Sequence, residues 1–151
     1  MAVFRSPYSV LPYFRTLLSM PFLAPDVIPT LHYHDALAAI DWLERAFGFE
    51  RHAVYEEGGV VQHSELRFGS GMVMLGSARE NEHGTKTPRE AGAPTGGLYV
   101  IVEDPDAHHE RAVAAGAEVI RGLQNEEYGS RGYSARDPEG YVWHFGTYRP
   151  E

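Results

Sequence analysis

The chain has 151 residues, of which 21 are Asp or Glu and 13 are Lys or Arg, so its formal net charge at pH 7 is −8. This charge opposes the counterion release that drives nucleic-acid binding, and no Lys/Arg cluster offsets it locally. The absence of cysteine excludes thiol catalysis, disulfides and zinc-thiolate sites. Histidine and carboxylate side chains are therefore the groups left for catalysis or metal binding.

Residues 1–25 differ from the rest, because they include two arginines and no acidic residue. The apolar patch from Leu17 to Ala24 is far shorter than the roughly 20 residues that a membrane span needs. Pro21 interrupts it and no small-x-small cleavage site follows cleanly, so we do not expect a signal peptide. We expect an N-terminal extension that packs outside a domain beginning near residue 26, in a cytoplasmic protein with no membrane partner.

From residue 26 the chain gives strand and helix signals in an order that occurs twice. In the first module, residues 26–77, a strand-like run ends at Asp35, which is placed to cap a helix. Leu37, Ile40 and Leu43 recur at helical spacing, and Gly48 suits a left-handed helix end. We expect strands at 27–34, 50–55, 60–68 and 72–75, and a helix at 36–47.

The second module, residues 97–148, repeats this β-α-β-β-β order, with strands expected at 97–102, 118–121, 130–136 and 141–146 and a helix at 106–115. The copies are offset by about 69 residues at the first strand and 70 at the last, which indicates a duplication. Residues 78–96 have no apolar period and predict a linker or mobile loop. Such a linker could let one module pair with the module of a second chain, so we expect a homodimer.

Three segments match a known family: Ala-Phe-Gly-Phe at the end of the first helix, the strand His63–Gly69 with its Met-Leu-Gly partner, and the turn from Arg136 to Tyr141. Through them, residues 26–148 resemble the glyoxalase/bleomycin-resistance/extradiol-dioxygenase superfamily, also called vicinal oxygen chelate proteins. The resemblance implies an α+β fold in which two β-α-β-β-β modules form a curved mixed sheet around a ligand cavity.

Metal-dependent members of that family hold a divalent ion with His, Gln or Glu from the first and last strands of each module. The resemblance places these four positions at Ile28, Met74, Gly97 and His144. Only His144 carries a donor suited to such an ion. We therefore expect no cofactor at the usual centre, which argues against glyoxalase and ring-cleaving dioxygenase activity, while a rearranged divalent metal site stays an alternative.

Strand alternation predicts which side chains face the cavity. On the first strand Leu31 and Tyr33 belong to the apolar face, which leaves His32 and His34 on the concave side. The other residues expected to line the cavity are Met72, Met74, Tyr99, Ile101, Val142 and His144. His63 and Glu65 share a face of the third strand, and a 70-residue offset equates His63 with Tyr133, which we expect at the cavity too.

These residues give a candidate catalytic pair, His63 and Glu65, and a ligand-binding set, His32, Met74, Tyr99, Tyr133 and His144. The polar group could form a displaced metal site of the two-His-one-carboxylate type, work as an acid/base pair, or hydrogen-bond a ligand. In structural terms, Glu65 could instead pair with Arg67, His32 could be a core histidine, and the methionines could be ordinary lining. The pair His108-His109 is expected on a solvated helix face.

Three functions follow from these readings. The first is a metal-independent protein, similar to the bleomycin-resistance branch, that binds a small, partly aromatic molecule in a dimeric cavity. The second is a lyase, isomerase or dioxygenase of the same superfamily that uses a rearranged His/Glu metal or acid/base site. The third is a protein-interaction module, which only the N-terminal extension supports.

Overall fold

The structure, a computed structural model, describes residues 21–151, so the predictions made for residues 1–20 lie outside it. The first module contains β1 (Thr30–Tyr33), α1 (Ala36–Phe47), β2 (Glu50–Glu57), β3 (Val60–Phe68) and β4 (Gly71–Ser77). Its strands form one mixed sheet in the order β1-β4-β3-β2. As the sequence predicts, Asp35 caps α1 by accepting a 3.0 Å hydrogen bond from the Ala38 amide, and Gly48 ends it in a left-handed conformation.

The second module contains β5 (Gly97–Ile101), α3 (Pro105–Ala114), β6 (Glu118–Asn125), β7 (Arg131–Arg136) and β8 (Val142–Gly146). Its sheet has the order β5-β8-β7-β6, which is the order of the first sheet one module later. The α+β class and the doubled β-α-β-β-β arrangement predicted from the sequence are therefore confirmed. β1 and β5 are edge strands that pair with one neighbour each.

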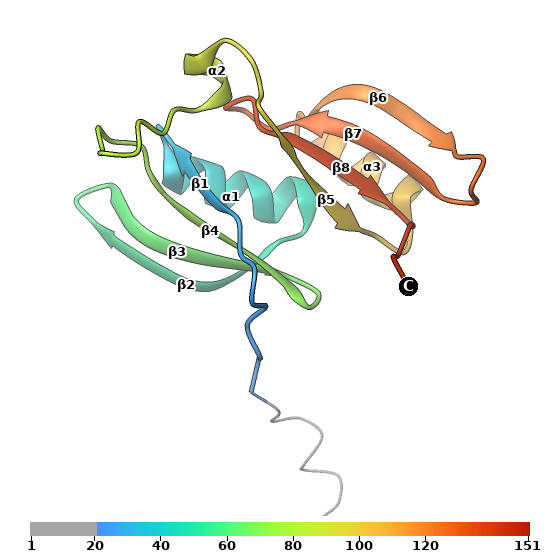
Figure 1. Cartoon of the computed structure of the whole chain (residues 1–151), viewed down its shortest axis with the longest axis horizontal. Helices are drawn as coiled ribbons and strands as arrows, with labels where there is room; N and C mark the ends of the chain where they lie inside the picture. The colour runs from blue at the N-terminus through green and yellow to red at the C-terminus, as the bar shows by residue number, and fades with distance from the viewer. Residues whose placement is uncertain (1–20) are drawn as a thin grey trace, which may run out of the picture.

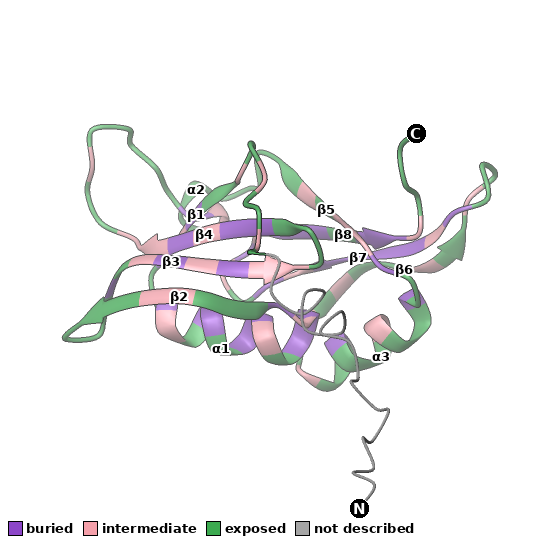
Figure 2. Ribbon diagram, turned by 90° about the horizontal axis from the view of Figure 1, so that it is seen from below, coloured by how far each residue is buried: buried purple, intermediate pink, exposed green. Residues whose placement is uncertain are grey.

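The two sheets lie beside each other, and α1 and α3 cover one face of them (Figures 1 and 2). Each sheet thus has a face that packs on helices and an open face. The core lies on the helix side, where the ring of Phe47 contacts those of Trp42, Trp143 and Phe145, with centroids 4.7, 5.6 and 4.6 Å away. Because Phe47 belongs to the first module and Trp143 and Phe145 to the second, one core serves both modules.

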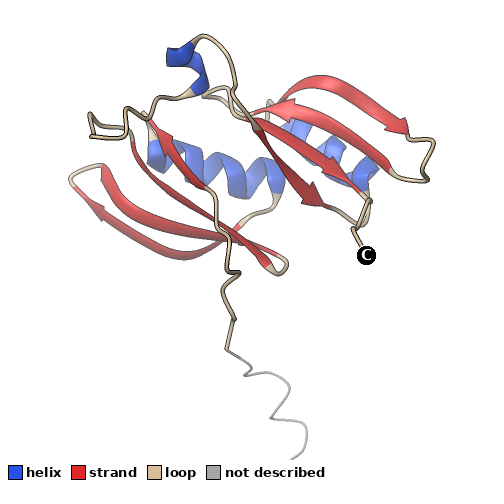
Figure 3. Cartoon of the chain, viewed as in Figure 1, coloured by secondary structure: helices blue, strands red, loops and turns tan. Residues whose placement is uncertain are grey.

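The segment between the modules is more ordered than its composition predicts, because it contains the short helix α2 (Pro88–Ala91; Figure 3). Thr87 and Glu90 form a reciprocal capping box, and the Thr87 side chain is buried. Arg89 Nε donates a 2.6 Å hydrogen bond to the carbonyl of Pro138 in the β7–β8 turn. Residues 78–96, expected to be a linker or mobile loop, thus include a short helix that contacts the second module.

The strand register corrects one predicted equivalence. Glu65 pairs with Met74, whereas Ser134 pairs with His144, so the β7–β8 connection is one residue longer than the β3–β4 connection. Ser134, not Tyr133 or Ala135, is therefore the counterpart of Glu65. Because side chains alternate along a strand, this one-residue difference puts Tyr133 on the helix side and Ser134 on the open face.

Candidate functional site

The open face of the second module brings together two of the predicted ligand-binding residues, Tyr99 and His144. They are register neighbours on β5 and β8, and Ser134 on β7 lies on the other side of His144. The Nδ1 atom of His144 is 2.7 Å from Ser134 Oγ, so the hydroxyl fixes the orientation of the imidazole. The three side chains border a hollow of about 200 Å³ that Glu126 and Tyr128 also line.

Two glycines let these rings lie close to the strand backbone. A Cβ atom on Gly97 would be 2.8 Å from His144 Nε2, and a Cβ atom on Gly146 would be 2.8 Å from the hydroxyl oxygen of Tyr99. Such distances are too short for carbon, so either side chain would push a ring away. Glycine at these positions thus gives the hollow its shape.

Exposed tyrosines form the rim of this hollow. The Tyr99 hydroxyl donates a 3.1 Å hydrogen bond to the carbonyl of Tyr148, whose ring packs edge-on against Tyr128 with centroids 5.7 Å apart. The exposed fractions of Tyr99, Tyr128 and Tyr148 are 48%, 69% and 49%. Sequence reasoning missed Tyr128 and Tyr148, because both lie outside the strands on which alternation could place them. Clustered exposed aromatic rings are typical of a binding surface.

The open face of the first module holds the predicted catalytic pair. His63 Nε2 is 2.9 Å from Glu65 Oε1, and His52 Nε2 is 3.8 Å from the other carboxylate oxygen. The ring of Tyr55, on β2 opposite His63, lies 6.0 Å from the imidazole. Both members of the pair are partly exposed, and Glu65 contacts His63 in place of the ion pair with Arg67 that the sequence also allowed. This arrangement can accept or release a proton at the imidazole.

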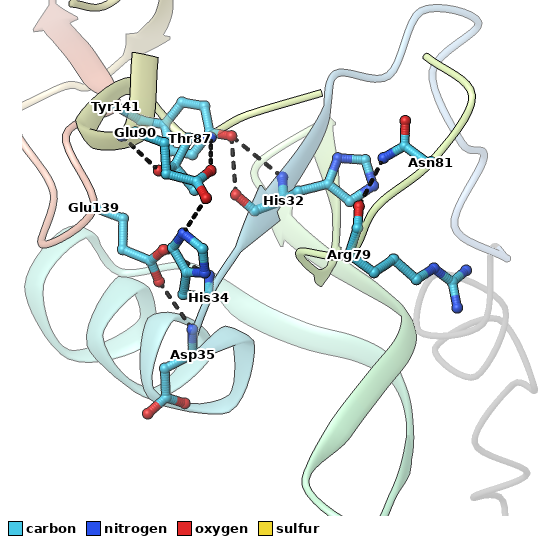
Figure 4. A network of polar contacts seen from close by, with 9 residues as sticks. All are labelled: His32, His34, Asp35, Arg79, Asn81, Thr87, Glu90, Glu139 and Tyr141. Atoms are coloured by element: carbon cyan, nitrogen blue, oxygen red, sulfur yellow. Dashed lines mark hydrogen bonds and ion pairs between the residues drawn. The ribbon is translucent and has the colours of Figure 1, made fainter. Parts of the chain in front are cut away.

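His32 and Met74 lie on the open side of β1 and β4. Met74 pairs with Thr30 and Glu65, and it is partly buried. The main chain of His32 is held by Tyr141, whose hydroxyl accepts from the His32 amide at 3.3 Å and donates to its carbonyl at 2.9 Å (Figure 4). The Nδ1 atom of His32 is buried and has no hydrogen-bond partner among the described residues.

His34, expected on the concave side, contacts α2 and the β7–β8 turn instead (Figure 4). Its Nε2 atom is 2.8 Å from Glu90 Oε1, and a backbone hydrogen bond from Thr87 lowers the pKa of Glu90. The amides of His34 and Asp35 donate to the two carboxylate oxygens of Glu139, at 2.6 and 3.1 Å. These contacts fasten the end of β1 to the β7–β8 turn and to α2.

Tyr133 was predicted to face the cavity, but its side chain lies on the helix side of the second sheet. The hydroxyl group is 2.6 Å from His108 Nδ1, and the ring stacks on Phe145. The prediction for His108 was also wrong, because this residue is half-buried between the modules and not on a solvated face. Its Nε2 atom is 2.8 Å from the carbonyl of Phe47, and burial lowers the pKa of the imidazole.

The residues at the family's metal positions do not fit a divalent ion. Ile28, Met74 and Gly97 offer no hard donor, and the space that a side chain on Gly97 would need is filled by the His144 ring. Within residues 21–151, no group of three or more His, Cys, Asp or Glu side chains is arranged to hold a metal. His63 and Glu65, the residues considered for a rearranged site, are therefore not part of such a group.

The predicted constellation is split between two sheets. His32, His63 and Glu65 lie on the open face of the first sheet, and His144 lies on that of the second. Between the sheets runs an apolar groove of about 770 Å³, bordered by β5, by the β3–β4 turn and by the segment that leads into β1. Trp143 and His108 contribute to its lining, and Tyr99 reaches it from β5.

Comparison with known proteins identifies the family. A model of the Glyoxalase/Bleomycin resistance protein/Dioxygenase superfamily matches residues 30–145. The chain belongs to this superfamily. An uncharacterized protein of Mycobacterium bovis is 34% identical to it over 125 residues, which are 81% of this chain and 82% of the relative.

The fold of the chain is also found in solved structures. TioX from Micromonospora sp. ML1 is similar with a TM-score of 0.66 and 31% identity, over 84% of this chain and 98% of TioX. A superfamily member from Sphaerobacter thermophilus DSM 20745 has a TM-score of 0.64 at 20% identity, over 81% of this chain and 97% of that one, which supports the fold alone. In the part of the chain that the structure describes, no helix is long and apolar enough to cross a membrane.

Proposed function

We propose that this superfamily member binds a small, partly aromatic organic molecule on the open faces of its modules, as a homodimer and without the usual metal centre. The observation that carries the proposal is the hollow of about 200 Å³ on the second module, where His144 and Tyr99 lie over glycines. Tyrosine rings supply apolar contact area, while His144 and Ser134 supply hydrogen-bonding groups that orient a ligand.

The proposal includes a second copy of the chain because the polar site residues of one chain lie on two different sheets. His63 and Glu65 lie on one sheet and His144 on the other, and no helix or further sheet formed by residues 21–151 covers either open face. A second chain related by a twofold axis can place its first module over the second module of this one. The ligand would then lie between two open faces, in contact with residues from both chains. Sedimentation at micromolar concentration tests this: the species should have about twice the 16.8 kDa mass of the chain, and a monomer alone contradicts it.

Binding can be tested with 2-naphthol, a neutral aromatic probe with one hydroxyl group. We expect His144→Ala and Tyr99→Ala each to weaken its binding roughly 5- to 30-fold, because a hydrogen bond or an aromatic contact enclosed between the two chains contributes about 1–2 kcal/mol. Val113→Ala, which truncates an exposed apolar side chain of α3 on the helix side, is the control. Elemental analysis of purified wild-type protein and of His144→Ala should reveal no stoichiometric metal that depends on His144. Unchanged probe binding in both site variants contradicts the proposal.

A second candidate is an acid/base enzyme, and the 2.9 Å contact between His63 and Glu65 favours it. A carboxylate next to an imidazole orients the ring and stabilises its protonated form, which suits proton abstraction next to a carbonyl group. Exchange of the α-protons of hydroxyacetone into D₂O, followed by NMR, measures such an activity. We expect the exchange to be catalysed by wild-type protein and lost in His63→Ala; equal rates in the two proteins contradict this function.

A further inference from the structure

Arg67 stands out on the open face of the first module because no acidic side chain in the described part of the chain pairs with its charge. It lies on β3, on the same face as His63 and Glu65, in register with Met72 on β4 and with Glu50 on β2. Its Nε atom is buried and has no hydrogen-bond partner among the residues that the structure places. Among residues 21–151 no carboxylate oxygen, that of Glu50 included, forms a salt bridge with its guanidinium group.

Other arginines of the two sheets have carboxylate partners. Arg131 on β7 forms two 2.8 Å hydrogen bonds with Asp106, and Arg136 forms one of 3.1 Å with Glu118. Arg51 on β2 is 2.8 Å from Glu44. A buried guanidinium donor without an acceptor is unfavourable, because it loses its contacts with water and gains none in return. Because the chain has more acidic than basic residues, a shortage of carboxylates does not explain this lack of a partner.

An aromatic ring covers the guanidinium group in place of an anion. The ring centroid of Phe22, in the segment before β1, is 3.8 Å from Arg67 Cζ. The same ring packs near His52 on β2, with centroids 5.4 Å apart. A ring in this position attracts the cation weakly but accepts none of its directed hydrogen bonds. Phe22 therefore shields Arg67 without satisfying it, and it comes from a segment that belongs to neither sheet.

We propose that Arg67 binds a carboxylate group of the ligand, and that Phe22 covers Arg67 until this group displaces it. The planar fork formed by Nε and a terminal nitrogen matches the two oxygens of a carboxylate. Glu65, the nearest acidic residue along the strand, is already engaged by His63. The inference rests on the proposed function, because it names a chemical class for the molecule that the open faces bind.

The overall negative charge of the chain does not oppose this recognition strongly. Exposed charges more than a Debye length away, about 8 Å at physiological ionic strength, are largely screened. A half-buried guanidinium group in direct contact with its anion is screened much less. The local charge therefore decides the preference, and added salt should weaken binding of an anion but not of a neutral molecule.

The test compares 2-naphthoate with 2-naphthol by calorimetry, on the full chain. We expect wild-type protein to bind the carboxylate more tightly, and Arg67→Gln to lose about tenfold or more of that affinity while its affinity for 2-naphthol stays unchanged. Arg67→Lys should retain part of the preference, because it keeps the charge but not the fork. Phe22→Ala should strengthen 2-naphthoate binding. Arg45→Gln, which removes an exposed arginine from α1 on the helix side, is the matched control.

Equal binding of 2-naphthoate by wild type and Arg67→Gln overturns the inference, as does absence of 2-naphthoate binding to wild type. Thermal unfolding of each variant shows whether it is folded. If Arg67→Gln is unfolded, the affinities of Arg67→Lys for 2-naphthoate and 2-naphthol are compared with those of wild type in its place. The proposed function is judged separately by 2-naphthol and its dependence on His144. Loss of the carboxylate preference with intact 2-naphthol binding would thus remove the role of Arg67 alone.

Discussion

The hydroxyl group of Tyr33, on β1, donates a 2.7 Å hydrogen bond to Oδ2 of Asp137, the residue that follows β7. The same oxygen accepts a 3.0 Å hydrogen bond from Trp143 Nε1, and Oδ1 accepts from the amides of Glu139 and Tyr141. Burial raises the pKa of Asp137, and these donors oppose the rise. One buried carboxylate therefore organises the β7–β8 turn and fastens it to the first module.

Tyr33→Phe tests this link. The change leaves the ring in the core but removes a donor from a buried carboxylate, so we expect the free energy of unfolding to fall by about 1–3 kcal/mol. Urea unfolding followed by tryptophan fluorescence measures the change. Tyr55→Phe is the control, because Tyr55 is exposed, and equal stability of the two variants would contradict the role assigned to Asp137.

His108 predicts how stability depends on pH. Its Nε2 atom donates to the Phe47 carbonyl, so its Nδ1 atom accepts from Tyr133 only while the imidazole is neutral. Burial lowers its pKa below the ordinary 6.5, so the unfolded chain takes up the proton first as pH falls. The contribution is complete above pH 6.5 and decreases as pH falls through 6.5 towards the lower pKa of the folded state.

We therefore expect His108→Gln to be less stable than wild type at pH 7.5. Between pH 7 and pH 5, the stability of this variant should decrease less than that of wild type. His109→Gln, which changes the next residue of α3, should keep the wild-type pH profile. Urea midpoints measured across this range provide the comparison. A steeper profile in His108→Gln than in wild type would show that the sign is wrong.

Gly97→Ala tests the close approach of His144 to β5. The new Cβ atom would meet His144 Nε2 at 2.8 Å and the Val142 carbonyl at 3.1 Å, so the ring has to move. We expect a loss of about 1–3 kcal/mol in unfolding free energy, as for other overpacked sites, together with weaker binding of 2-naphthol. Gly96→Ala introduces the same methyl group one residue earlier, where it would meet nothing within 4 Å, and it should leave both quantities unchanged.

Thr87→Ala tests the docking of the inter-module segment. The change removes a buried hydroxyl group that accepts a hydrogen bond from the Glu90 amide, and caps of this kind contribute about 1 kcal/mol. We expect faster tryptic cleavage after Lys86 and Arg89, since both lie at or beside α2. Thr95→Ala, at an exposed position of the same segment, is the control. Equal cleavage rates in the two variants would mean that the capping box does not restrain the segment.

Local signals predicted the secondary structure well because capping and alternation depend on near neighbours. Asp35 and Gly48 bound α1 as expected, and the offsets of 69 and 70 residues agree with the register of Thr30 with Met74 and of Tyr99 with His144. What alternation could not supply is the point at which the extra residue enters. The extra residue lies in the β7–β8 turn, C-terminal to Tyr133. An error of one residue in its position assigns the side chains of β7 to the opposite face of the sheet.

The remaining misses concern contacts between segments that are distant in sequence. No sequence signal near His108 indicates that its imidazole forms a hydrogen bond with the carbonyl of Phe47, 61 residues earlier. Phe22 likewise meets Arg67 only because the chain before β1 runs past β3. His63 with Glu65 and Tyr99 with His144 could be paired in advance, because strand geometry alone places them together.

The carboxylate of Glu139 makes the first module depend on the second. It accepts the amides of His34 and Asp35 at the entrance of α1, so the second module completes the capping of a helix in the first. A fragment that ends at residue 77 would lose these acceptors and would expose the ring of Phe47 to water. The first module is therefore not self-sufficient, because it depends on the second for these acceptors and for the cover of Phe47.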